Sequence, residues 1–203
     1  LVLYSGTTPT LGFQTRIGTY GSVSGLLPNP WNAGNYPTGQ TLTVTLDTTN
    51  ASGLIAAVNS ASVLDVQIQD DTSVDYLTLR LCRHEQLPTP TPTVPGGPGA
   101  WCPAPGMVTT FTAGLADNFG SSPDPAPTPR PAFVAMVGSP PQTGFDGTNY
   151  DKHLLHTFSG LPTGIVALQL ETKVKPLGQT PENDSLVLYS GTTPTLGFQT
   201  RIG

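Results

Sequence analysis

The sequence predicts an all-β protein, an antiparallel β-sandwich that repeats along the chain. The first observation is a duplication: LVLYSGTTPTLGFQTRIG fills residues 1–18 and again 186–203, so the period is 186 − 1 = 185 residues, as in a tandem array. The second is the alternation of apolar and polar residues in several short segments. The third is a composition of 23 Gly and 22 Pro with only 10% charged residues, which is typical of loop-rich, secreted β-proteins.

The alternating segments are the predicted strands. The clearest is 41–47 (TLTVTLD), in which Leu42, Val44 and Leu46 fall on one face. The strands predicted in this way are 41–47, 63–69, 74–81, 107–114, 153–158 and 165–175, with two more on either side of a turn at 190–194. The DDTS sequence at 70–73 predicts that the strands on either side of it form a hairpin.

Three other segments carry helix or loop signals. Residues 50–61 (NASGLIAAVNSA) place their larger apolar side chains at helical spacing after a capping-type start, so a short helix is predicted. Residues 131–137 are expected to hold one helical turn. Gly, Pro and Asn recur so densely between 19 and 39 that a long loop is predicted there.

Residues 83–106 are predicted to be a Pro/Thr-rich linker between sandwiches. The PTPTPTVP run in it cannot donate a regular ladder of backbone hydrogen bonds and favours an extended, stiff conformation. Of the only two cysteines, Cys82 directly precedes this segment and Cys102 lies near its end. In a secreted protein the two are expected to form a disulfide, which would close a loop of about 20 residues and stabilise the fold by about 3 kcal/mol. Pairing between neighbouring repeats is the alternative.

A repeat of this kind can be read as a circle, from the middle of one period into the next. In that order the segments DKHLLHTFSGLPTGIVALQLETKVKP, ENDSLVLYSG, TGQTLTVTLD and VLDVQIQDDTSVDYLTLRL resemble the jelly-roll-like β-sandwich modules of secreted bacterial surface proteins. The resemblance implies a jelly-roll-like fold, an extracellular or cell-surface location, and a structural or carbohydrate-binding role. The predicted domain is permuted: residues 107–203 begin a sandwich that the next repeat completes, residues 1–82 complete the preceding one, and 83–106 link them.

Charge and motif content argue against several classes of function. A net charge of −5 with eight Lys and Arg gives no basic surface for nucleic acid. No apolar run approaches the roughly 20 residues of a membrane-spanning helix, and an export signal is expected outside this sequence because the chain begins inside a repeat. No serine has the spacing of a nucleophile elbow, and the few glutamates do not form a glycosidase pair. Neither an enzyme nor a cofactor is therefore predicted.

Aspartates gather around the predicted hairpin, and two explanations for them stay open. A calcium ion prefers several oxygen ligands from one such loop. Alternatively, Asp-Asp-Thr-Ser is simply favourable turn chemistry. The candidate calcium ligands are Asp65, Asp70, Asp71 and Asp75.

Loop aromatics and hydroxyl groups supply two further candidate sites. Flat aromatic rings would stack on a sugar or else pack over one end of the sandwich; they belong to Tyr20, Trp31 and Tyr36. Glycosylation is expected in the Pro-Thr run and at two Asn-X-Ser sequons. The acceptors would be Thr89, Thr91, Thr93, Asn50 and Asn183.

Two functions remain in contention. In the first, the duplicated segment supplies strands that need a sheet, through the apolar residues Leu186, Leu188, Phe198 and Ile202. The chain contains two copies of this segment, but the permuted domain has a place for one of them, so the other copy is left for a neighbouring unit. Units of this protein would then assemble with one another, head to tail, into an extracellular filament or surface fibre. The second function is a carbohydrate-binding or adhesive module of a secreted bacterial protein, repeated for avidity.

Overall fold

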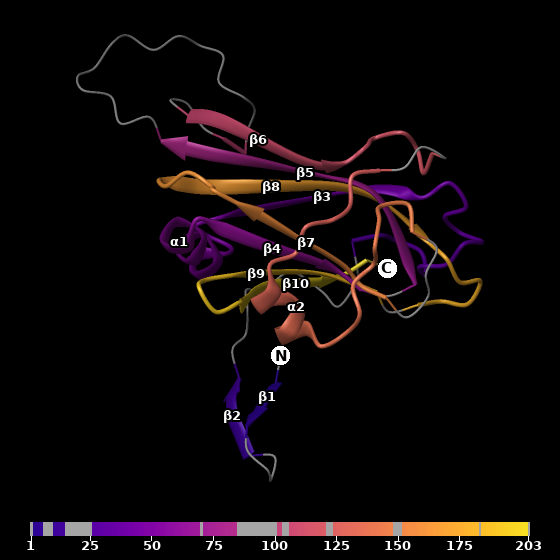
Figure 1. Cartoon of the computed structure of the whole chain (residues 1–203), viewed down its shortest axis with the longest axis horizontal. Coiled ribbons are helices and arrows are strands. Elements are labelled where there is room, and N and C mark those ends of the chain that lie inside the picture. The colour runs from indigo at the N-terminus through magenta and orange to yellow at the C-terminus, as the bar shows by residue number, and fades with distance from the viewer. Residues whose placement is uncertain are drawn as a thin grey trace.

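A computed structural model of the chain shows a β-sandwich made of two four-stranded antiparallel sheets (Figure 1). The structure describes residues 26–69, 71–84, 101–102, 106–120, 124–147, 152–182 and 184–202, and the backbone alone of 2–5 and 10–14. The predicted all-β sandwich is therefore confirmed.

The strands divide between the sheets as follows. The first sheet has the order β10-β9-β4-β7, made of β10 (Thr195–Arg201), β9 (Ser185–Ser190), β4 (Val63–Ile68) and β7 (Leu154–Ser159). The second has the order β3-β8-β5-β6, made of β3 (Gln40–Asp47), β8 (Ile165–Pro176), β5 (Thr72–His84) and β6 (Gly106–Gly114). A further pair, β1 (Val2–Ser5) and β2 (Thr10–Gln14), forms a two-stranded sheet of its own.

The core lies between the sheets because the alternating strands turn one apolar face inwards. On β3, Leu42, Val44 and Leu46 are at most 5% exposed, whereas Thr41 and Thr43 lie on the exposed side. The inward residues predicted for this strand are thus confirmed.

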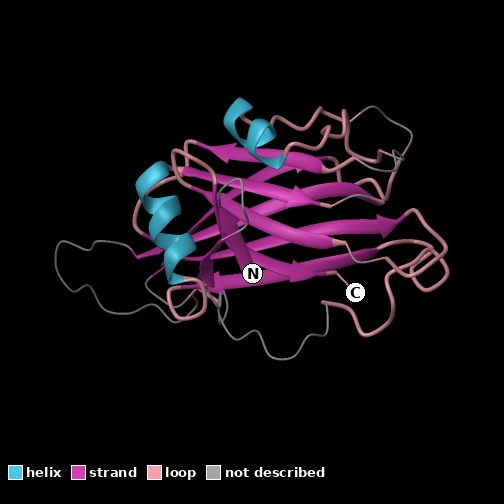
Figure 2. Cartoon of the chain, turned by 90° about the horizontal axis from the view of Figure 1, so that it is seen from below, coloured by secondary structure: helices cyan, strands magenta, loops and turns pink. Residues whose placement is uncertain are grey.

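Two helices flank the sheets in the described residues (Figure 2). The helix α1 (Ser52–Ala61) lies at one end of the strands and buries Leu54, Ile55 and Val58. The side chain of Asn59 exchanges two hydrogen bonds with the backbone of Ile165, which fixes α1 to the start of β8. The short helix α2 (Pro131–Val137) begins at a proline, which suits a first helical turn. Both helices agree with the sequence prediction.

The predicted hairpin across DDTS is wrong, because β4 and β5 lie in different sheets. The chain crosses from one layer to the other at this point: Asp71 adopts a positive φ of 57°, and its carbonyl accepts a hydrogen bond from the amide of Leu177. Turn residues specify that the chain changes direction. They do not specify which sheet the next strand joins.

The two ends of the segment between β5 and β6, which was predicted to be a linker, lie close together. Arg83 pairs with Met107 and His84 with Gly106 at its two ends, and Cys82 forms a disulfide with Cys102. β5 and β6 are therefore the two strands of one antiparallel hairpin in this chain, and residues 85–100 and 103–105 between them lie outside the described residues. The predicted cysteine pairing is the one that the structure contains, and the glycosylation candidates Thr89, Thr91 and Thr93 lie outside the described residues.

Residues 26–84 and 106–202 complete one sandwich with each other. In the second sheet, β3 and β5 from the first part alternate with β8 and β6 from the second. The sequence prediction assigned these two parts to sandwiches of successive repeats. In this chain, which contains one full period, the two parts pair with each other.

Candidate strand-docking site

The duplicated segment forms the same hairpin twice. In the second copy β9 pairs with β10 through Val187↔Gln199, Leu188↔Phe198, Tyr189↔Leu196 and Ser190↔Thr195. In the first copy β1 pairs with β2 through Val2↔Gln14, Leu3↔Phe13, Tyr4↔Leu11 and Ser5↔Thr10, and the register shifts at the same point. Because the pairing is the same inside and outside the four-stranded sheet, the segment itself specifies the hairpin.

The second copy occupies an edge position in the first sheet, where β9 pairs with β4 and β10 is the outer strand. The four apolar side chains predicted to need a sheet are each at most 1% exposed: Leu186, Leu188, Phe198 and Ile202. Gly197 lies at the register shift, where a Cβ atom would come within 2.5 Å of a methyl group of Leu54. Glycine is therefore required for α1 to pack over the hairpin.

Arg130 holds the turn of this hairpin. Its Nη1 and Nη2 donate to the carbonyls of Thr192 and Gly191 at 3.0 and 2.7 Å. Its Nε and Nη2 also donate to the carboxylate of Asp65, with a shortest distance of 2.6 Å, and the hydroxyl of Thr157 donates to the same carboxylate. Asp65 is fully buried, so it is the fixed anion that orients the guanidinium toward the turn.

This arrangement corrects one expectation and reveals residues that the sequence analysis missed. Asp65 is not a calcium ligand here, because Arg130 neutralises its charge. Arg130 was not predicted as a site residue, since it lies in a proline-rich loop, 65 positions from its partner. The one available signal was a lone Asp among the apolar residues of a strand.

The strand-docking site is the edge position beside β4 that β9 and β10 fill, with Arg130 at the turn of the hairpin. Trp31 lies at the opposite end of the hairpin, beside Asp184, and is fully buried. Its Nε1 donates to the hydroxyl of Thr72 at 2.9 Å and to the carboxylate of Asp184 at 3.1 Å. Its ring packs against that of Tyr36, with 5.3 Å between centroids. The sugar-stacking hypothesis is therefore wrong for Trp31, which packs over the end of the sandwich, and Tyr20 lies outside the described residues.

The chain that follows the first copy reaches the end of the second. The amides of Leu26 and Leu27 donate to the carbonyls of Arg201 and Ile202, each at 2.9 Å. The segment that leads into β3 therefore begins beside the last residues of β10.

A second cluster of side chains gathers at the far end of the other sheet. Asp75 on β5 is 1% exposed, and its carboxylate oxygens come within 4.8 Å of those of Asp117 and Asp146. Burial, followed by repulsion from Asp124, Asp75 and Asp117, raises the pKa of Asp146 to about 7. Of the three predicted calcium ligands that lie among the described residues, Asp65, Asp71 and Asp75, the structure places Asp75 in this acidic group.

The remaining predicted residues lie elsewhere. Asp71 belongs to the crossover between the sheets, and Asp70 lies outside the described residues. The side-chain amide of Asn50 accepts from the backbone of Asp47 and donates to that of Thr45, so its nitrogen is engaged in the turn before α1. Asn183 also lies outside the described residues.

Fold and site together define an all-β sandwich module whose edge position is filled by one copy of a duplicated hairpin. No protein-family model matches the chain, and no solved structure matches it. The nodulation protein NolNO of Sinorhizobium fredii (strain NBRC 101917 / NGR234) is 35% identical over 88 residues, which is 41% of this chain but 12% of that protein. A match this short does not place the chain in a family. Neither helix among the described residues is long and apolar enough to cross a membrane.

Proposed function

We propose that the protein is a structural repeat unit of an extracellular filament or surface fibre, in which consecutive units complete one another by strand exchange at the docking site. The observation that carries the proposal is the duplicated hairpin, which has the same register whether it is seated in the sandwich or forms a two-stranded sheet. A two-stranded hairpin is at best marginally stable in water, so the first copy gains stability by docking.

Strand order supports the same proposal. In a jelly roll, which is built from Greek keys, the first strand of the domain lies beside the last. The strand beside β9 is β10, whereas the strand that precedes β3 in the chain is β2. Because β2 repeats the sequence of the first five residues of β10, either strand fits the place beside β9. With β2 there, the two sheets would have jelly-roll order.

The chain has the reach for this exchange. Leu26 and Leu27 are already bonded to Arg201 and Ile202, whose counterparts in the first copy are Arg16 and Ile17. The nine residues from Ile17 to Gly25 span up to about 30 Å when extended. This length is ample for β2 to lie where β10 lies while Leu26 keeps its position.

Arg130 accepts either copy, because it binds the turn through backbone carbonyls. The turn sequence SGTTPT is the same in both copies. The buried Asp65 keeps the guanidinium oriented regardless of which copy arrives. In an array of repeats, the hairpin of one unit would thus serve the next, and the disulfide fits an oxidising, extracellular environment.

The test uses a matched pair of substitutions, Phe13→Asp and Phe198→Asp, in the full chain. Phe198 is 1% exposed, so a carboxylate there disables the second copy for docking. We expect the Phe198→Asp variant to fold with its first copy docked, and the double variant to unfold. Thermal unfolding followed by circular dichroism measures both. Identical unfolding of the Phe198→Asp and double variants would show that the first copy never docks.

Assembly is read out on the same proteins by sedimentation and negative-stain microscopy. The wild type is expected to form fibres that lengthen with concentration, and Phe13→Asp, which keeps its own second copy, is expected to remain a folded monomer. Fibres of normal length from Phe13→Asp would contradict strand exchange. The alternative, a carbohydrate-binding module, lost its main support when Trp31 proved to be buried, and a glycan-binding assay on the same samples tests it.

A further inference from the structure

Four aspartates from three separate segments converge beside β5. Asp75 comes from β5 itself, Asp117 and Asp124 from the loop after β6, and Asp146 from the loop before β7. Carboxylate oxygens of Asp75, Asp117 and Asp146 lie within 4.8 Å of one another. Asp124 lies beside this group of three, and its charge contributes to the raised pKa of Asp146.

Three oxygens in this cluster are buried and have no hydrogen-bond partner: both carboxylate oxygens of Asp146 and Oδ1 of Asp124. An unpartnered buried carboxylate oxygen is costly, because it has lost water and gained nothing in return. The two oxygens of Asp146 are therefore an independent sign that something absent from the protein chain itself belongs here.

Backbone amides donate to four further oxygens of the cluster and fix the loop around it. The carboxylate of Asp75 accepts from the amides of residues 117, 118 and 119, at 3.0 to 3.3 Å. Asp117 Oδ1 accepts from Gly120, and Asp124 Oδ2 accepts from Leu115. These bonds orient the carboxylates without filling the space between them.

Positive charge from the protein does not balance the cluster. The ion pairs among the described residues are Arg80–Glu171 and Arg130–Asp65, and neither involves these aspartates. Lys175 acts favourably on Asp146, but its ammonium also lies over the ring of Phe119, 4.8 Å from the centroid. Lys173 also lies at this loop, where its ammonium donates to Asn118 Oδ1 and lies over the same ring, so four carboxylates stand against two lysines.

We infer that a divalent cation, Ca²⁺, binds between Asp75, Asp117, Asp124 and Asp146. The donor set contains only carboxylate oxygens, which suits a hard cation, and Ca²⁺ tolerates irregular geometry and bidentate carboxylates better than Mg²⁺ does. The ion joins β5 to the loops after β6 and before β7, and so fixes the end of the second sheet. This site shares only Asp75 with the ligands expected from the sequence, and it does not depend on the strand-exchange proposal.

Calcium titration of the full chain by isothermal calorimetry, after chelation and desalting, tests the inference. The wild type should bind one Ca²⁺ per chain, with a Kd of about 10⁻⁴ to 10⁻³ M if it resembles extracellular calcium modules. Asp146→Asn and Asp124→Asn should weaken binding on the order of tenfold or more. Calcium should raise the unfolding temperature of the wild type but not of Asp146→Asn.

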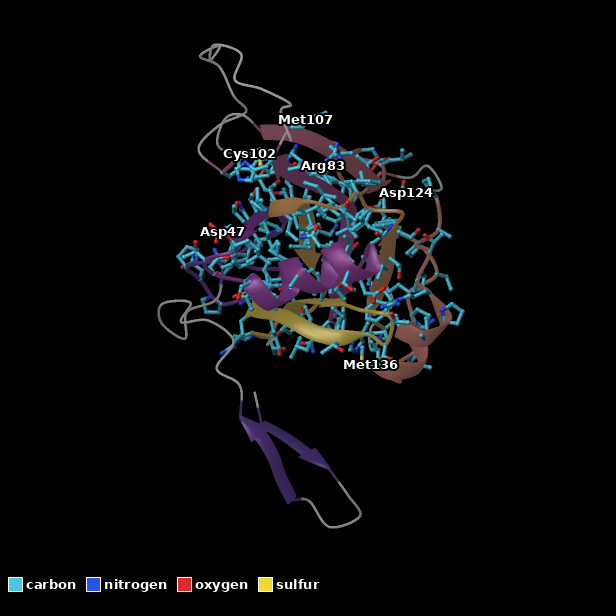
Figure 3. All side chains as sticks on the ribbon, turned by 90° about the vertical axis from the view of Figure 1, so that its left-hand side faces the viewer. Asp47, Arg83, Cys102, Met107, Asp124 and Met136 are labelled. Carbon is cyan, nitrogen blue, oxygen red and sulfur yellow. A yellow bond between two sulfur atoms is a disulfide. The ribbon has the colours of Figure 1, made fainter. Side chains whose placement is uncertain are left out.

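Asp47→Asn is the matched control, since it removes the same charge far from the cluster. Asp47 pairs with Ala167, whereas Val74 pairs with Val174 at the opposite end of β8, and Figure 3 shows Asp47 and Asp124 on opposite sides of the molecule. This control should bind calcium as the wild type does.

Two results would overturn the inference. One is a folded wild type that takes up no Ca²⁺ at millimolar concentration, which would mean that Lys175 and a proton neutralise the cluster. The other is unchanged affinity in both Asp146→Asn and Asp124→Asn, which would place the ion elsewhere. The Asp124→Asn variant keeps a side-chain oxygen for the Leu115 amide, so it serves if Asp146→Asn fails to fold.

Discussion

Replacing Arg130 by methionine removes the cation from a fully buried carboxylate. Asp65 is 0% exposed, and the side chain of Arg130 is 21% exposed. Removing one partner of such a pair leaves the other charge buried and unpaired, which typically costs about 3–5 kcal/mol. The hydroxyl of Thr157 still donates to Asp65, so we expect a loss in the lower half of that range, about 3–4 kcal/mol.

A double variant, Arg130→Met with Asp65→Leu, separates the stranded charge from the lost turn contacts. Apolar replacement of a whole buried pair is often nearly neutral. Arg130 also bonds the carbonyls of Gly191 and Thr192, which water partly replaces because Thr192 is exposed. The double variant should therefore lose only about 1 kcal/mol.

Urea unfolding at neutral pH, followed by the fluorescence of the buried Trp31, measures these free energies. Arg130→Lys is an informative companion, because it keeps the charge but not the forked geometry, and should fall between the wild type and Arg130→Met. A loss below about 1 kcal/mol for Arg130→Met, or a double variant no more stable than it, would refute the reasoning from a buried, turn-binding ion pair.

Three further predictions concern pH, packing and redox state. Burial lowers the pKa of His156 from 6.5 to about 4, so the unfolded chain takes up this proton at a higher pH than the folded protein does. The folded protein should therefore lose up to about 3 kcal/mol of stability as the pH falls from about 6.5 to 4. Urea unfolding of the wild type and of His156→Gln across that range measures this loss, which the variant should not show. Gly197→Ala forces a methyl group against α1 and should cost about 1–3 kcal/mol in a chain whose first copy is disabled by Phe13→Asp, whereas Gly12→Ala alone should leave the unfolding temperature unchanged. Reducing the Cys82–Cys102 disulfide should lower the unfolding free energy by about 3 kcal/mol without loss of the far-ultraviolet β signal.

The sequence by itself determined the local elements of this protein. Alternation identified β3, helical spacing identified α1, and the duplicated segment specified its own hairpin and its apolar residues Leu188 and Phe198, which are buried as predicted. These features depend on backbone periodicity and on contacts between near neighbours, both of which are visible in a short stretch of sequence.

Only the tertiary structure decided which elements meet. The turn between β4 and β5 has residues that favour a hairpin, yet these strands enter different sheets. β4 pairs with β9 and β5 pairs with β8, and turn residues do not specify these partners. Arg130 reaches Asp65 across 65 positions, and the aspartates at 75, 117 and 146 meet only after the sheet has formed. Charges are brought together by the path of the chain between strands, so their partners depend on the topology of the whole sandwich rather than on any local pattern.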